Sequence, residues 1–231
     1  MSGIYLLVVA FLGVVIGVFA YIGIRQQNLV LTVNAVVSLG VAVSPVLIEW
    51  LTDWIFDEHI GFVPELYLWL SVAAVIHTIG MYGLYESTRW WDHLAHLISA
   101  GFIAAGVYAS LIAFDQHSWQ SIAILTIVFT FLLGVFWELL EVFTRDVSKA
   151  LGKEPLLVPY GRWDTTLDLV FDIVAALLVI GLDIRVFVNL ATAYPEVNEL
   201  VVYVIVFLST VGCLILSVII LLHRHLEPVS T

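Results

Sequence analysis

Seven stretches of this 231-residue sequence are long and apolar enough to cross a membrane as helices. A helix needs about 20 apolar residues to span a hydrocarbon core of about 30 Å. The stretches are continuously apolar rather than alternating, which argues against a transmembrane β-barrel. They lie at residues 4–24, 29–48, 64–84, 93–114, 122–142, 165–188 and 200–222. The sequence therefore predicts an all-α integral membrane protein, a bundle of about seven transmembrane helices.

The composition agrees with a membrane location and excludes several other classes of protein. Apolar and aromatic residues make up 62% of the chain and the mean hydropathy is +1.08, whereas soluble proteins are about 45–50% apolar. The net charge of −11 argues against nucleic acid as a partner. The single cysteine, Cys213, rules out an intramolecular disulfide and a cysteine-based zinc site. We expect a multi-pass protein of the cell (plasma) membrane whose partners are membrane lipids.

The basic residues predict how the chain is oriented. With seven spans, seven of the eight lysines and arginines fall on one side of the membrane, and only Arg185 falls on the other. The positive-inside rule makes the basic side cytoplasmic, which places the N-terminus outside and the C-terminus in the cytoplasm. No linker or low-complexity stretch divides the sequence. We therefore assign residues 1–231 to a single polytopic transmembrane domain.

Ionisable residues inside the spans gather at one depth. Each costs about 2.5–3.5 kcal/mol at the centre of a bilayer, so their presence indicates function. Four consecutive spans, within residues 64–188, carry them toward the predicted cytoplasmic leaflet. They are His77 in one span, Asp92, His93 and His96 in the next, then Glu138 and Glu141, and finally Asp164, Asp168 and Asp172. Because residues three or four apart share a helix face, each helix offers one polar edge to the bundle.

So many carboxylates cannot all ionise in a dry bundle. Three arrangements would resolve this: a bound divalent metal, shared protons, or a water-filled cavity open to the cytoplasm. Mixed imidazole and carboxylate ligands from several helices suit Fe, Mn or Zn. We therefore assign six residues as candidate metal ligands and two more, Asp92 and His93, as candidate catalytic groups that transfer protons. The candidate ligands are His77, His96, Glu138, Glu141, Asp168 and Asp172.

Several of these residues also have ordinary structural explanations. Asp92 and Asp164 each follow a tryptophan at a predicted helix start, where aspartate is a favourable N-cap. Glu141 could lie at the membrane interface, and a lone His77 would usually make a hydrogen bond between helices. Two glycines of the third span, Gly80 and Gly83, are expected to permit close helix packing.

Three short strings resemble a known family. The strings are Trp91-Asp92 with His96, Trp137-Glu138 with Glu141, and Trp163-Asp164 with Asp168. This trio resembles the YjdF-like family of small prokaryotic inner-membrane proteins. The likeness covers roughly half of the chain, and the acidic outer loops look like those of a halophilic member. The resemblance supports the importance of these residues, but it implies no reaction, because the family has no assigned activity.

Three functions remain open from the sequence. The first is a metal-dependent membrane enzyme whose site, in the cytoplasmic leaflet, acts on a lipid-like substrate. The second is a transporter of divalent cations or protons, and the third is a structural or partner-binding membrane protein. The outer halves of the fourth, fifth and sixth spans hold no ionisable residue over ten or more positions, at 97–114, 122–137 and 173–182. A site that is closed on one side favours the enzyme over the transporter.

Overall fold

The computed structural model describes residues 3–57, 61–114, 118–152 and 162–226, and every regular element within these ranges is helical. Six of the described helices are long and apolar enough to cross a membrane. They are Ile4–Arg25, Leu29–Ile55, Pro64–Ser87, Trp90–Ala113, Trp119–Ala150 and Pro195–His223. The all-α membrane architecture is thus confirmed, while the direction in which the chain is inserted stays a prediction.

The remaining expected span, residues 165–188, corresponds to helix α7 (Arg162–Gly181). This helix is 20 residues long, which is enough to cross a membrane, but it contains Asp164, Asp168 and Asp172. By length and composition it does not join the six candidate spans, because the three acidic residues fall in every stretch of the helix that is long enough to cross a membrane. The same three acidic residues are candidate functional groups.

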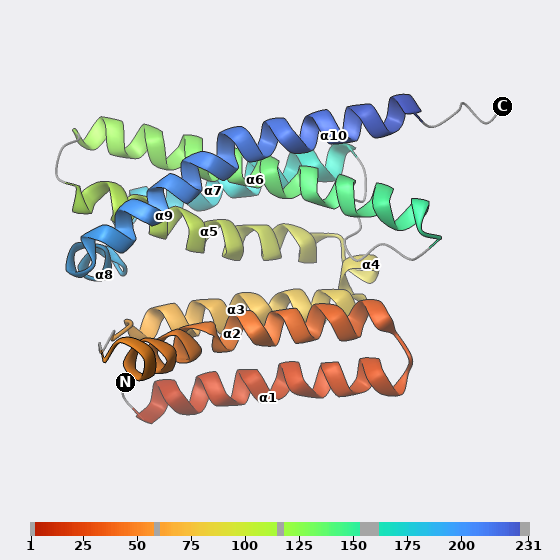
Figure 1. The fold of residues 1–231 in the computed structure, drawn as a ribbon, viewed down its shortest axis with the longest axis horizontal. Coiled ribbons are helices and arrows are strands. Elements are labelled where there is room, and N and C mark those ends of the chain that lie inside the picture. Colours follow the sequence, from red (N-terminus) through yellow and green to blue (C-terminus); the bar gives the residue numbers. More distant parts are fainter. Residues whose placement is uncertain (1–2, 58–60, 115–117, 153–161, 227–231) are drawn as a thin grey trace. The chain divides into compact units, whose positions relative to one another are not determined.

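The chain divides into two compact units, Met1–Phe102 and Ile103–Thr231, and the assignment of a single domain stays a prediction. In the first unit, α1 (Gly3–Arg25), α2 (Leu29–Phe56) and α3 (Pro64–Ile79) pack against one another (Figure 1). Their shared core is built from small and branched residues, namely Ile16, Ala35, Ala42 and Ala74. Small side chains let membrane helices approach closely.

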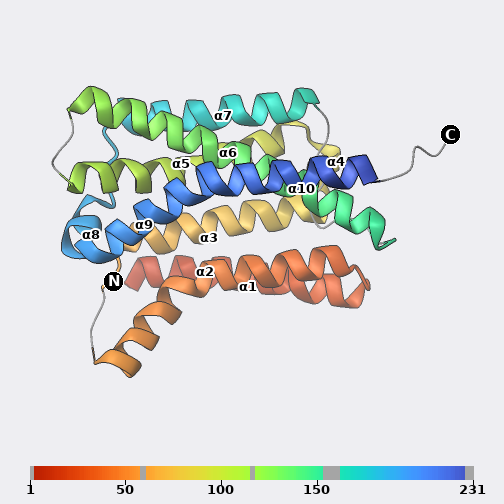
Figure 2. The ribbon, with the colours of Figure 1, turned by 45° about the horizontal axis from the view of Figure 1, so that its top comes forward.

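Helix α2 is bent within its length. Pro45 lies inside the helix, where its ring removes one backbone hydrogen bond and displaces the preceding turn. Figure 2 shows the second half of α2 turned away from the axis of the first half. Its start is fixed by Asn28, whose side chain accepts a hydrogen bond of 2.9 Å from the backbone N–H of Leu31, as expected for an N-cap.

An unusual turn follows α3. A π-helical segment, η1 (Gly80–Leu84), leads into the short helix α4 (Tyr85–Ser87). Gly83 has φ of 143°, a conformation that L-residues with a side chain rarely adopt. A Cβ atom at Gly80 would collide with the ring of Tyr85. The expectation that these glycines serve helix packing is therefore wrong: they shape the turn and seat Tyr85 in it.

Helix α5 (Trp90–Ala113) begins after this turn, and its later residues belong to the second unit. That unit continues with α6 (Trp119–Ala150), α7, α8 (Val188–Ala193), α9 (Pro195–Phe207), η2 (Leu208–Gly212) and α10 (Cys213–Leu226). Helix α6 packs against α7 and α10. Its buried face repeats every fourth residue, at Ile122, Thr126, Thr130, Gly134 and Glu138.

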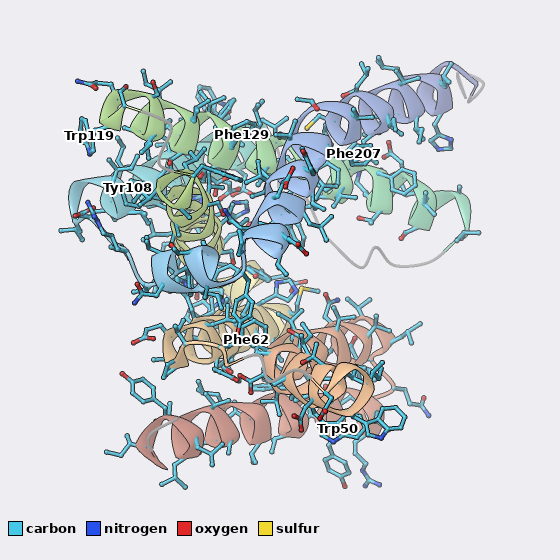
Figure 3. The ribbon with its side chains drawn as sticks, turned by 60° about the vertical axis from the view of Figure 1, so that its left-hand side comes forward. Trp50, Phe62, Tyr108, Trp119, Phe129 and Phe207 are labelled. Carbon is cyan, nitrogen blue, oxygen red and sulfur yellow. The ribbon has the colours of Figure 1, made fainter. Side chains whose placement is uncertain are left out.

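The end of α7 is tied to α5 by polar contacts. Asp183, with φ of 50°, accepts hydrogen bonds from the Tyr108 hydroxyl at 2.7 Å and from Arg185 Nε at 2.8 Å. These two donors, Arg185 first, lower the pKa of the exposed Asp183 carboxyl below its ordinary value. Figure 3 labels Tyr108, which is buried, and Trp119, which is 61% exposed at the start of α6.

Candidate metal centre

Three carboxylates are buried on the two packed helices α6 and α7. Glu138 on α6 is 7% exposed, and Asp168 and Asp172 on α7 are each 2% exposed. Asp168 and Asp172 are one turn apart on α7, so they share a face. Gly134 lies one turn before Glu138 on α6, and a Cβ atom there would collide with the Asp172 carboxylate. The absence of a side chain at Gly134 therefore makes room for this acid.

Burying three ionised acids in an apolar bundle is costly unless positive charge, shared protons or water offset it. The sequence holds no lysine or arginine at residues 90–144 or 163–184, so the helices that carry these acids supply no basic side chain at this depth. Histidine or a bound cation would supply positive charge, and shared protons or water would lower the charge that needs to be offset. Two histidines, His93 and His96, precede this cluster in the sequence. Either could carry positive charge or bind a cation.

Two groups of described side chains have the geometry to hold a metal ion. One consists of His93, Asp164 and Asp168, and the other of His96, Glu138 and Asp168. In each group the ligand atoms all lie within 4.8 Å of one another. Asp168 belongs to both groups, so a single carboxylate links them. These groups could hold a metal ion, and the assignment of His96, Glu138 and Asp168 as its ligands stays a prediction.

The structure changes the explanation for two acids. Helix α5 starts at Trp90 and the described part of α7 starts at Arg162, so Asp92 and Asp164 lie inside the first turn of each helix. The expectation that they are N-caps is therefore wrong. Asp164 was not among the assigned ligands, although its four-residue spacing from Asp168 is a ligand-like signal. The N-cap explanation for Asp164 was preferred over a ligand role.

Four other assigned residues belong to neither group. His77 uses both ring nitrogens in hydrogen bonds of 3.1 Å, to the Tyr85 hydroxyl and to Asn34 Oδ1. Glu141 accepts a hydrogen bond of 3.2 Å from Trp137 Nε1 on the same helix. Asp172 is buried against Gly134, and Asp92 is half-buried one residue before His93. Their assigned roles as ligands or catalytic groups stay predictions.

The dimensions of α6 place Glu138 near a membrane boundary. At 1.5 Å per residue the 32-residue helix is about 48 Å long, well beyond a hydrocarbon core of about 30 Å. The exposed Trp119 at its start is typical of an interfacial aromatic residue. Counting about 20 residues from Trp119 across the core ends at Glu138. This count predicts that the acid lies at the depth where the apolar core meets the headgroups.

The chain was compared with known proteins on three levels. No curated protein and no solved structure matches it. A family described as "Predicted membrane protein (DUF2238)" matches residues 7–189, more than three quarters of the 231 residues. The matched range includes both ligand groups and is consistent with the YjdF-like resemblance. The chain therefore belongs to this family of multi-pass membrane proteins.

Proposed function

We propose that this protein is a membrane-embedded hydrolase that depends on divalent metal and acts on a lipid-like substrate. The observation that carries the proposal is the pair of ligand groups that share Asp168. Mixed imidazole and carboxylate ligands suit Mn, Fe or Zn. A carboxylate common to two ligand groups is typical of centres that hold two ions about 3.5–4 Å apart.

The roles of the residues follow from the groups. His96 and Glu138 would hold one ion and His93 and Asp164 the other, with Asp168 bridging them. This assignment gives His93 a ligand role in place of the proton transfer expected from the sequence. When bound, such ions polarise water and the carbonyl or phosphoryl oxygen of a substrate. Asp92 and Asp172 are then the nearby carboxyls left to accept the proton that water releases.

The position of the site supports a lipid-like substrate. Glu138 falls at the boundary of the hydrocarbon core, and His93 and Asp164 lie in the first turns of their helices. The ester and phosphoester bonds of lipids lie at this same depth, and the headgroup region supplies water as the co-reactant. The distribution of lysine and arginine favours the cytoplasmic leaflet.

Metal analysis tests the binding part of the proposal. We expect the purified protein to contain about two ions of Mn, Fe or Zn per chain, and His96→Ala and Glu138→Ala to lose them. Two matched controls remove the same side-chain types elsewhere: His223→Ala on α10 and Glu86→Ala in the exposed turn after α3. Metal-free protein, or equal loss in the controls, would contradict the proposal.

A second assay separates hydrolysis from transport. The protein is reconstituted in vesicles of bacterial phospholipids, and lipid products are followed by chromatography with and without chelator. We expect metal-dependent release of a lipid fragment and no metal or proton flux down an imposed gradient. Flux that disappears in Asp172→Asn, without lipid turnover, would favour the transporter instead.

A further inference from the structure

The two histidines of the ligand groups occupy a short, closely held part of α5. His93 and His96 lie between Trp91 and Ile98 in the sequence. The indole Nε1 of Trp91 donates a hydrogen bond of 3.0 Å to the carbonyl of Ile76 on α3. At the other end, Trp69 Nε1 of α3 donates one of 2.9 Å to the carbonyl of Ile98. Helix α3 therefore fixes the position and rotation of the turns that carry both histidines.

The bond at Trp91 is made beside a second buried polar contact. Ile76 directly precedes His77, whose Nδ1 lies 3.1 Å from the Tyr85 hydroxyl and whose Nε2 lies 3.1 Å from Asn34 Oδ1. Asn34 Nδ2 donates to the carbonyl of Val30 at 2.9 Å, so its Oδ1 faces His77 as an acceptor. His77 Nε2 therefore carries the hydrogen, and the Tyr85 hydroxyl donates to Nδ1.

The conformation of the turn after α3 places Tyr85 beside His77. The π segment Gly80–Leu84 adds a wide turn, and Gly83 adopts a backbone conformation that other residues rarely reach. Gly80 lacks the Cβ atom that would collide with the Tyr85 ring. Tyr85 and His77 are also in edge-on contact, with ring centroids 5.9 Å apart. Gly83 thus marks a kink between α3 and α4, on the far side of which Tyr85 lies.

We infer that His77 and Tyr85 are positioning residues for the metal centre: their hydrogen bond holds the turn from which α5 starts, and so aims His93 and His96. The inference rests on the proposed metal function. It replaces the direct ligand role expected for His77 with an indirect one. Groups hydrogen-bonded to a metal ligand typically change metal affinity by about 10- to 100-fold when they are altered, and we expect the lower end of this range because His77 and Tyr85 act through the turn.

The test removes one hydroxyl from Tyr85 and keeps the ring. Tyr85→Phe is compared with Tyr82→Phe, in the same turn, because the exposed Tyr82 contacts Phe19 through its ring alone among the contacts described. We expect Tyr85→Phe to weaken Mn²⁺ binding about tenfold and to alter the visible spectrum of the Co²⁺-substituted protein. Tyr82→Phe should leave both unchanged. Gly80→Ala, which displaces the ring, should reproduce the Tyr85→Phe result.

Hydrogen exchange of the metal-free protein gives a readout that does not depend on metal. Backbone amides of residues 91–98 should exchange faster in Tyr85→Phe than in Tyr82→Phe. Equal exchange in the two variants, or equal Mn²⁺ affinity, would overturn the inference. A wild-type protein that binds no metal would overturn the proposed function instead, and the exchange data would still decide whether Tyr85 positions α5.

Discussion

Replacing Gly134 by alanine tests the packing of α6 against α7. The new Cβ would overlap the Asp172 carboxylate and lie 3.2 Å from a methyl group of Leu169. Asp172 is 2% exposed and has a short side chain, so its carboxylate has little room to move. Overpacking of this kind costs about 1–3 kcal/mol, whereas the gain in helix propensity from glycine to alanine is about 1 kcal/mol. We expect a net loss of about 1 kcal/mol.

The matched control is Gly106→Ala on α5, where an added Cβ meets no atom within 4 Å. This variant keeps the propensity gain without the collision. In thermal unfolding of the detergent-solubilised protein, a change of 1 kcal/mol shifts Tm by about 2–4 °C for a chain of this size. We expect Gly134→Ala to lower Tm by that amount and Gly106→Ala to raise it. A rise in Tm for Gly134→Ala would refute the packing argument.

Three further predictions concern other parts of the chain. Reporter fusions at both ends should place the N-terminus outside and the C-terminus in the cytoplasm, and a cytoplasmic N-terminus would contradict the basic-residue argument. Because the pKa of Asp183 is lower in the folded protein, its contacts with Arg185 and Tyr108 stabilise the fold above the ordinary carboxyl pKa. This stability is lost as the pH falls through the lowered value, so Asp183→Asn should flatten the acid limb of a Tm-against-pH curve, and an unchanged limb would count against it. Ser71 is fully buried and its Oγ has no hydrogen-bond partner among the described residues; Ser71→Ala should therefore leave Tm equal or higher, and a clear drop would reveal an unrecognised partner.

The membrane helices could be predicted from the sequence because length and continuous apolarity are local properties. The depth of Glu138 and Asp168 is predicted in the same way, since each lies a countable number of residues from a helix end. Helical spacing and the cost of burying charge predict that they form a site with His96. These parts of the site needed no knowledge of which helix neighbours which.

The turn after α3 could not be predicted in this way. Gly80 and Gly83 suggest close helix packing in an apolar sequence, and nothing local indicates that the helix widens there. His77 finds its partners in Tyr85, after the turn, and in Asn34 on a different helix. Asp164 was missed for another reason. An aspartate after tryptophan at an apparent helix start fits two roles equally well, and only its place inside the described part of α7 decides between them.

The two π segments determine how the chain responds to a single-residue deletion. In each, a backbone N–H bonds five residues back, from Tyr85 to Gly80 and from Cys213 to Leu208. In η2, losing one residue would let a regular α-helix form. Because the wide turn accommodates one extra residue, the residues after it would keep their faces, and the Cys213 thiol would stay on the side of the Leu132 carbonyl. In η1 the φ of 143° at Gly83 interrupts the helix, so the same deletion would also remove or displace a kink.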